Sequence, residues 1–147
     1  MAKFSKGLLN AMLGAMKDSF DNCELRVFSV ASPDDIPATA GAAEAGTLLM
    51  TLSADGGGGS LTFSTPSEGL LVKSSGEEWK TNSIDTGGAM AYFRLVDKSD
   101  DGTEDPGAFR LQGTCGMVGT DMLVSNTTLS QGSPWSLAYF NVELPTL

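Results

Sequence analysis

The chain has 147 residues, enough for one domain whose core needs no metal or disulfide to hold it together. Hydrophobic residues make up 41% of it, which excludes a disordered chain on composition. The net charge is −9 and there is no histidine, so the commonest general base, the Ser-His and Cys-His nucleophile systems and most transition-metal sites are excluded.

The charges are unevenly distributed along the chain. Lys3, Lys6 and Lys17 precede the first acidic residue, Asp18, and the remainder carries all 18 acidic residues against six basic ones. A body this acidic repels phosphate groups, so we expect no nucleic-acid partner. The apolar N-terminal segment is interrupted by Asn10 and lacks a small-residue cleavage site, and no segment has the apolar length of a membrane span. We therefore expect neither a signal peptide nor a membrane partner.

Residues 4–20 are predicted to form an amphipathic helix. Five apolar side chains at helical spacing share one arc: Leu8, Leu9, Met12, Leu13 and Met16. Gly7 and Gly14 each weaken the helix by about 1 kcal/mol relative to alanine, so it needs a surface to lie on. That surface is either an open edge of the protein's own sheet or a neighbouring subunit, and the pattern favours neither. We assign residues 1–21 to a helix or arm and residues 22–147 to the main domain.

Beyond Cys23, short segments rich in β-branched and aromatic residues alternate with glycine, proline, asparagine and serine turns. The expected strands cover residues 23–30, 46–52, 61–64, 70–73, 78–82, 89–96, 109–118, 121–124, 127–129 and 134–144. Residues 34–46, rich in alanine, are predicted to be an exposed loop. No helix separates the strands, which excludes a parallel α/β sheet. The prediction is an all-β fold, an antiparallel β-sandwich (jelly-roll-like or Ig-like) with one N-terminal helix.

A hairpin of residues 89–96 and 109–118 is the expected centre of this domain. A period of two places Phe93 and Leu95 on its apolar face, with Tyr92 and Arg94 on the other. Extending the same pattern predicts one core containing Phe93, Leu95, Phe109, Leu111, Cys115, Phe140 and Val142. The two cysteines, Cys23 and Cys115, are expected to be buried free thiols rather than a disulfide.

The loop that joins the two hairpin strands resembles the first half of a calcium-binding loop. Oxygen-bearing side chains alternate ahead of Gly102, which permits a sharp turn. Ala108 stands where a closing glutamate belongs, and Glu104 or Asp105 could substitute for it. The candidate calcium ligands are Asp97, Ser99, Asp101 and Asp105. The favoured alternative is a solvated acidic hairpin tip with no cofactor.

Four segments resemble a family of small virion proteins of tailed bacteriophages that are encoded among the head genes. They are Cys23–Ser29, Gly46–Leu52, Thr86–Asp97 and Leu111–Val118, and the likeness extends from about residue 8 to residue 144. The resemblance carries over no active-site residues. It implies a non-enzymatic structural role, namely a capsid decoration (cement) protein that binds the major capsid protein on the outside of the head.

This resemblance sets the remaining expectations. The protein would be made in the host cytoplasm and reside on the capsid exterior, as a homo-oligomer (dimer or trimer) that binds through the 4–20 helix or the 32–46 loop. The alternative is a tail or tail-tip module that recognises a host glycan through loops bearing Trp79 or Trp135. In both cases the protein binds and does not catalyse.

Overall fold

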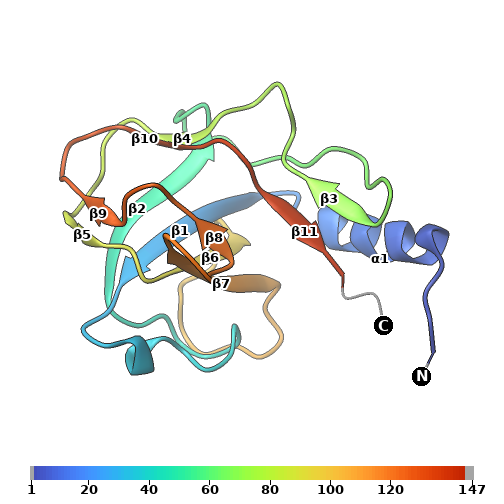
Figure 1. Cartoon of the computed structure of the whole chain (residues 1–147), viewed down its shortest axis with the longest axis horizontal. Coiled ribbons are helices and arrows are strands. Elements are labelled where there is room, and N and C mark those ends of the chain that lie inside the picture. Colours follow the sequence, from blue (N-terminus) through green and yellow to red (C-terminus); the bar gives the residue numbers. More distant parts are fainter. Residues whose placement is uncertain (1, 145–147) are drawn as a thin grey trace.

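The computed structural model describes residues 2–144 (Figure 1). In chain order the elements are α1 (Lys6–Ser19), β1 (Cys23–Ser29), the 3-10 turn η1 (Pro33–Asp35), β2 (Thr47–Ala54), β3 (Leu70–Val72), β4 (Trp79–Thr81), β5 (Gly88–Ala89), β6 (Tyr92–Asp97), β7 (Arg110–Gly116), β8 (Met122–Leu123), β9 (Thr128–Leu129), β10 (Trp135–Leu137) and β11 (Asn141–Glu143). Among these described residues, the only helical segment besides α1 is the three-residue turn η1, which agrees with the prediction of a single N-terminal helix.

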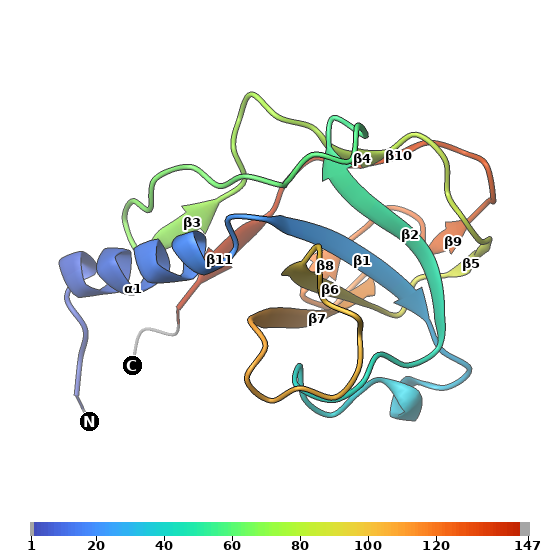
Figure 2. The ribbon, with the colours of Figure 1, turned by 180° about the vertical axis from the view of Figure 1, so that it is seen from behind.

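Seven strands form one curled sheet in the order β10-β4-β2-β1-β6-β7-β8 (Figures 1 and 2). Two short pairs, β11-β3 and β5-β9, complete the fold. The all-β class and the N-terminal helix are therefore confirmed. The structure does not confirm a two-layered sandwich, and the prediction of purely antiparallel strands is wrong, because β7 and β8 run parallel.

A side-chain contact explains the parallel pair. After β7 the chain makes a turn and comes back beside the same strand at Asp121. The Oδ2 of Asp121 accepts hydrogen bonds from the backbone N–H (2.8 Å) and the Oγ1 hydroxyl (3.0 Å) of Thr114. This contact brings Met122 alongside Cys115, in the same direction as β7. Parallel strands usually need a connection of a dozen or more residues. Here a five-residue turn suffices, since the pair is only two residues long.

The core lies inside the curl of the sheet and centres on four aromatic side chains. The ring centroid of Trp79 lies 5.2 Å from that of Phe63 and 5.1 Å from that of Phe140. Phe93 packs edge-on against Phe140, with ring centroids 5.7 Å apart. Of the predicted core residues, Phe93, Leu95, Cys115 and Phe140 are buried, whereas Leu111 and Val142 are partly buried against them.

Phe109 corrects the core prediction, because its side chain is 65% exposed. Strand β7 begins at Arg110, so Phe109 belongs to the preceding loop. The alternation of faces that holds for Leu111 and Cys115 does not extend to a residue outside the ladder.

Both cysteines are buried free thiols, as expected. The Sγ of Cys23 lies 3.4 Å from the carbonyl oxygen of Leu61, to which it donates. Burial raises the pKa of Cys23, and likewise that of Cys115, to about 12. Neither thiol is therefore a nucleophile at neutral pH.

Helix α1 covers part of its own body. Ser5 caps it by accepting a hydrogen bond from the N–H of Leu8 (3.2 Å). Leu9 and Leu13 are buried, and the Oδ1 of Asn10 accepts from the N–H of Gly69 (2.9 Å), just before β3. Among residues 2–144, no helix combines the length and the apolar character needed to cross a bilayer.

Candidate functional site

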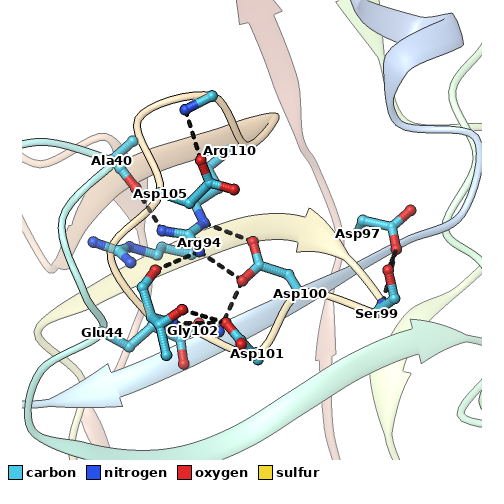
Figure 3. A network of polar contacts seen from close by, with 12 residues as sticks. Ala40, Glu44, Arg94, Asp97, Ser99, Asp100, Asp101, Gly102, Asp105 and Arg110 are labelled. Carbon is cyan, nitrogen blue, oxygen red and sulfur yellow. Dashed lines mark hydrogen bonds and ion pairs between the residues drawn. The ribbon is translucent and has the colours of Figure 1, made fainter.

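All three arginines of the chain lie on the face of the sheet that points away from the core. Arg26 of β1 pairs with Arg94 of β6, and Arg94 pairs with Gln112 of β7. Arg110 lies two residues before Gln112, so it projects from the same face. This arginine row binds the two loops that cover the central hairpin, residues 33–46 and 97–109. Figure 3 shows Arg94 and Arg110 among these loops.

Arg94 is fully buried, and its hydrogen-bond acceptors among residues 2–144 are all neutral. Its Nε donates to Oε1 of Gln112 (2.8 Å), and its Nη1 and Nη2 donate to the carbonyl oxygens of Ala42 (2.8 Å) and Thr39 (3.3 Å). The hydroxyl of Tyr92, also fully buried, bonds both the N–H and the carbonyl of Ala45. Residues 39–45 therefore cover this face of the sheet, whereas the sequence suggested a loop free in solvent.

The acidic loop, residues 97–109, is bound by the same row of arginines. Asp100 takes two hydrogen bonds from Arg110, and Glu44 forms an ion pair with Arg26 (2.9 Å). The two loops also bond each other directly, from Glu44 N–H to the Gly102 carbonyl (2.8 Å) (Figure 3). The arginines supply the counter-charge that this concentration of carboxylates needs.

The candidate calcium ligands Asp97, Ser99, Asp101 and Asp105 all line one depression of about 400 Å³, but each carboxylate is engaged within the loop itself. The carboxylate of Asp97 accepts from the N–H and hydroxyl of Ser99, and that of Asp101 from the N–H and hydroxyl of Thr103. Asp105 bonds the N–H of Gly107. Hydrogen bonds from Ser99 lower the pKa of Asp97, and those from Thr103 lower the pKa of Asp101. Each carboxylate thus closes its own turn.

Within residues 2–144 there is no group of three or more Asp, Glu, Cys or His side chains that could hold a metal ion. Calcium binding by this loop remains a prediction. Sequence reasoning missed the ion pair between Asp100 and Arg110, because the candidate ligands were chosen by spacing within the loop. The sequence did contain a signal for this ion pair, because strand alternation places all three arginines on the face opposite the apolar one.

The predicted interface residues of the helix divide into two sets. Leu9 and Leu13 are buried against the body, and Met16 is partly buried. Leu8 is 48% exposed and Met12 is 41% exposed, one helical turn apart. We call Leu8 and Met12 the helix stripe. The helix therefore both covers its own sheet and presents an apolar surface, so the two alternatives left open by the sequence are compatible.

Two adjoining depressions meet at Leu123 and Tyr139, which are 65% and 88% exposed. The first, which we call the slot, has a volume of about 490 Å³. It is lined by β7 and β8 on one side and by residues 139–143 on the other. The second, which we call the aromatic depression, has a volume of about 430 Å³ and lies between the segment after β8 and strand β10.

The two tryptophans proposed for glycan recognition differ in accessibility. Trp79 is fully buried in the core, and its Nε1 donates to Oε1 of Glu77 (2.7 Å). It cannot contact a glycan, which corrects that part of the prediction. Trp135 is partly buried and lines the aromatic depression together with Tyr139.

Comparisons with protein-family models, with curated proteins and with solved structures found no match to this chain. What the protein does is therefore inferred from the surfaces described above.

Proposed function

We propose that this protein is a non-enzymatic structural component of a tailed-phage virion that decorates and stabilises the outer capsid by binding the major capsid protein. The helix stripe is the observation that carries this proposal. Two large apolar side chains, Leu8 and Met12, stand exposed on a helix that buried Leu9 and Leu13 hold against the body. Apolar surface presented by a well-anchored element is typical of protein–protein contact.

The charge distribution supports a position outside the capsid. The chain carries 18 acidic residues against nine basic ones, and all three arginines are bound within the loop network. A surface facing packaged DNA would need basic residues to offset phosphate repulsion, whereas an outer surface has no such requirement. After synthesis in the host cytoplasm, the protein would join the exterior of the head.

Self-association would strengthen a contact this small. Capsid lattices offer two-fold and three-fold positions, where a dimer or trimer can repeat one weak contact. Linking copies raises the effective concentration of each further contact without any new side chain. The stripe suits such a role, because Leu9 and Leu13 anchor α1 to the body and present Leu8 and Met12 in a defined orientation.

The test replaces the stripe without touching the anchor. In the Leu8→Gln, Met12→Gln variant we expect the oligomer mass to fall, or binding to capsids lacking this protein to weaken by about tenfold or more. Lys17→Gln is the matched control, since it introduces the same side chain on the opposite side of α1. Analytical ultracentrifugation and capsid co-sedimentation give the readouts. Unchanged mass together with undiminished capsid binding in the double variant would refute the proposal.

The aromatic depression favours a second candidate, glycan recognition by a tail or tail-tip module. Within residues 2–144, no residue lining it is charged, although the protein as a whole is strongly acidic. Trp135 and Tyr139 provide aromatic surface, while Asn126 and Ser136 provide polar groups, a combination suited to a neutral sugar. Titration with neutral oligosaccharides would change the fluorescence of Trp135, with buried Trp79 as a constant background. Tyr139→Ala would abolish that change, and no response to any sugar would eliminate this candidate.

A further inference from the structure

The slot is bordered on one side by a free edge of β7. The N–H of Cys115 donates to the carbonyl of Ala91 (2.8 Å), so those two residues form a hydrogen-bonded pair of the antiparallel ladder. Such pairs alternate with non-bonded ones, which makes Arg94 and Gln112 a non-bonded pair. The N–H and C=O of Gln112 therefore point away from β6. Strand β8 pairs with Cys115 and Gly116, and no other strand within residues 2–144 pairs with this edge of Gln112, which therefore opens into the slot.

Strand β11 presents a second free edge to the same slot. The N–H of Lys73 donates to the carbonyl of Phe140 (2.9 Å), which sets the alternation between β3 and β11. Asn141 and Glu143 are then non-bonded positions, with N–H and C=O groups directed away from β3. Both residues line the slot. Main-chain donors and acceptors of two strands thus border one depression, an arrangement that can receive an additional strand.

The side chains of the slot indicate what kind of strand fits. Its apolar lining includes Phe93, Leu111, Met122, Phe140 and Val142, and its exposed rim is formed by Leu123 and Tyr139. Among the described residues that line the slot, two are charged, Asp121 and Glu143, and both are acidic. A strand bearing a large apolar side chain and a basic residue, with no acidic one, complements this surface.

We propose that the slot binds the N-terminal arm, residues 2–5, of a second copy of this chain as an added β-strand. This inference rests on the proposed self-association and specifies its contact. The arm contains Lys3 and the 39%-exposed Phe4, and no acidic residue precedes Asp18. It ends at Ser5, whose backbone is extended (φ −73°, ψ 156°). Both views show it leading away from α1 and from the body (Figures 1 and 2).

In the exchanged arrangement, Phe4 packs against Tyr139 at the rim. The long side chain of Lys3, on the other face of the added strand, supplies a positive charge to the acidic lining formed by Asp121 and Glu143. The main chain of the arm bonds the free edges at Gln112 and Asn141. Reciprocal exchange between two copies satisfies both slots at once, as a two-fold symmetric contact requires.

Disulfide trapping between two differently tagged chains tests the proposal. One chain carries Phe4→Cys and the other Tyr139→Cys, while the natural thiols, Cys23 and Cys115, are buried and unreactive. Mild oxidation of the mixture should yield a covalent heterodimer. The control replaces Tyr139→Cys with Ser75→Cys, an exposed position outside the slot. A heterodimer yield no greater than that of the control would overturn the inference, as would a disulfide formed only within a single chain carrying both cysteines.

A charge reversal adds a second readout. Lys3→Glu should lower the trapping yield by about threefold to tenfold, and Glu143→Lys in the partner should restore it. A yield indifferent to both changes would contradict the predicted strand register. The helix-stripe variant separates the two proposals. If Lys3→Glu in the arm leaves the oligomer mass unchanged while the helix-stripe variant lowers it, the slot inference fails and the proposed function stands.

Discussion

Arg110 holds Asp100 by two parallel hydrogen bonds, from Nε to Oδ2 at 2.6 Å and from Nη2 to Oδ1 at 2.7 Å. The two side chains are only 2% and 6% exposed. Arg110 also donates to the carbonyl oxygens of Thr103 and Ala42, which belong to the two covering loops. This one pair therefore links β7 to both loops, alongside the bonds that Arg26 and Arg94 make to them.

We expect Asp100→Asn to destabilise the protein by about 3–5 kcal/mol, the usual cost of leaving a buried charge without its partner. Hydrogen bonding from Arg110 lowers the pKa of Asp100 below its ordinary value of 3.8. The stabilisation is fully present above pH 3.8 and is lost as the pH falls through the lower folded-state value. Urea unfolding at several acidic pH values should show a larger loss in the parent than in Asp100→Asn, in which Asp97 and Asp101 still titrate with lowered pKa values. Asp34→Asn, at an exposed position, should behave like the parent.

Phe140 and Phe109 provide a matched pair of truncations. Phe140 is 8% exposed within the aromatic cluster, whereas Phe109 is 65% exposed. Phe140→Ala should lower the free energy of unfolding by about 3–5 kcal/mol, because it removes ring contacts and leaves a cavity. Phe109→Ala should change it by less than about 0.5 kcal/mol. Equal losses in thermal or urea unfolding would contradict the assignment of Phe109 to the surface.

Alanine substitutions at Gly46 and Gly58 would distinguish the cost of backbone strain from that of a steric clash. Both have a left-handed backbone, with φ of +80° and +79°. A Cβ at Gly46 would lie 1.9 Å from the Ser29 carbonyl oxygen, whereas one at Gly58 meets nothing within 4 Å. Gly58→Ala should cost about 1 kcal/mol from strain alone, and Gly46→Ala should cost distinctly more. Similar unfolding midpoints for the two variants would show that the β1–β2 connection adapts without cost.

The cysteines should resist alkylation in the folded protein. Burial raises the pKa of Cys23 and of Cys115 to about 12, so almost no thiolate is present at pH 8. Iodoacetamide should modify both residues only after denaturation, as mass spectrometry would report. Rapid labelling of either residue in native buffer would place that thiol at the surface.

Local patterns were sufficient for much of the fold. The helix prediction at 4–20 lies within two residues of α1 at each end, because helical periodicity is a property of adjacent residues. Alternation likewise identified Phe93 and Leu95 as core residues of the central hairpin. It could not show that Tyr92 and Arg94, on the opposite face, are also fully buried. Their cover comes from residues 39–45, about fifty positions earlier in the chain.

Composition and periodicity alone thus establish an acidic all-β protein with an N-terminal helix and two buried thiols, since each of these follows from residue type and short-range spacing. The tertiary structure decided the rest. Hydrogen bonding between Thr114 and Asp121 set β8 parallel to β7, and three arginines on separate strands bound the two loops. Packing on β3 determined which side of the helix stayed exposed at Leu8 and Met12. These outcomes depend on contacts between distant segments, which no local pattern encodes.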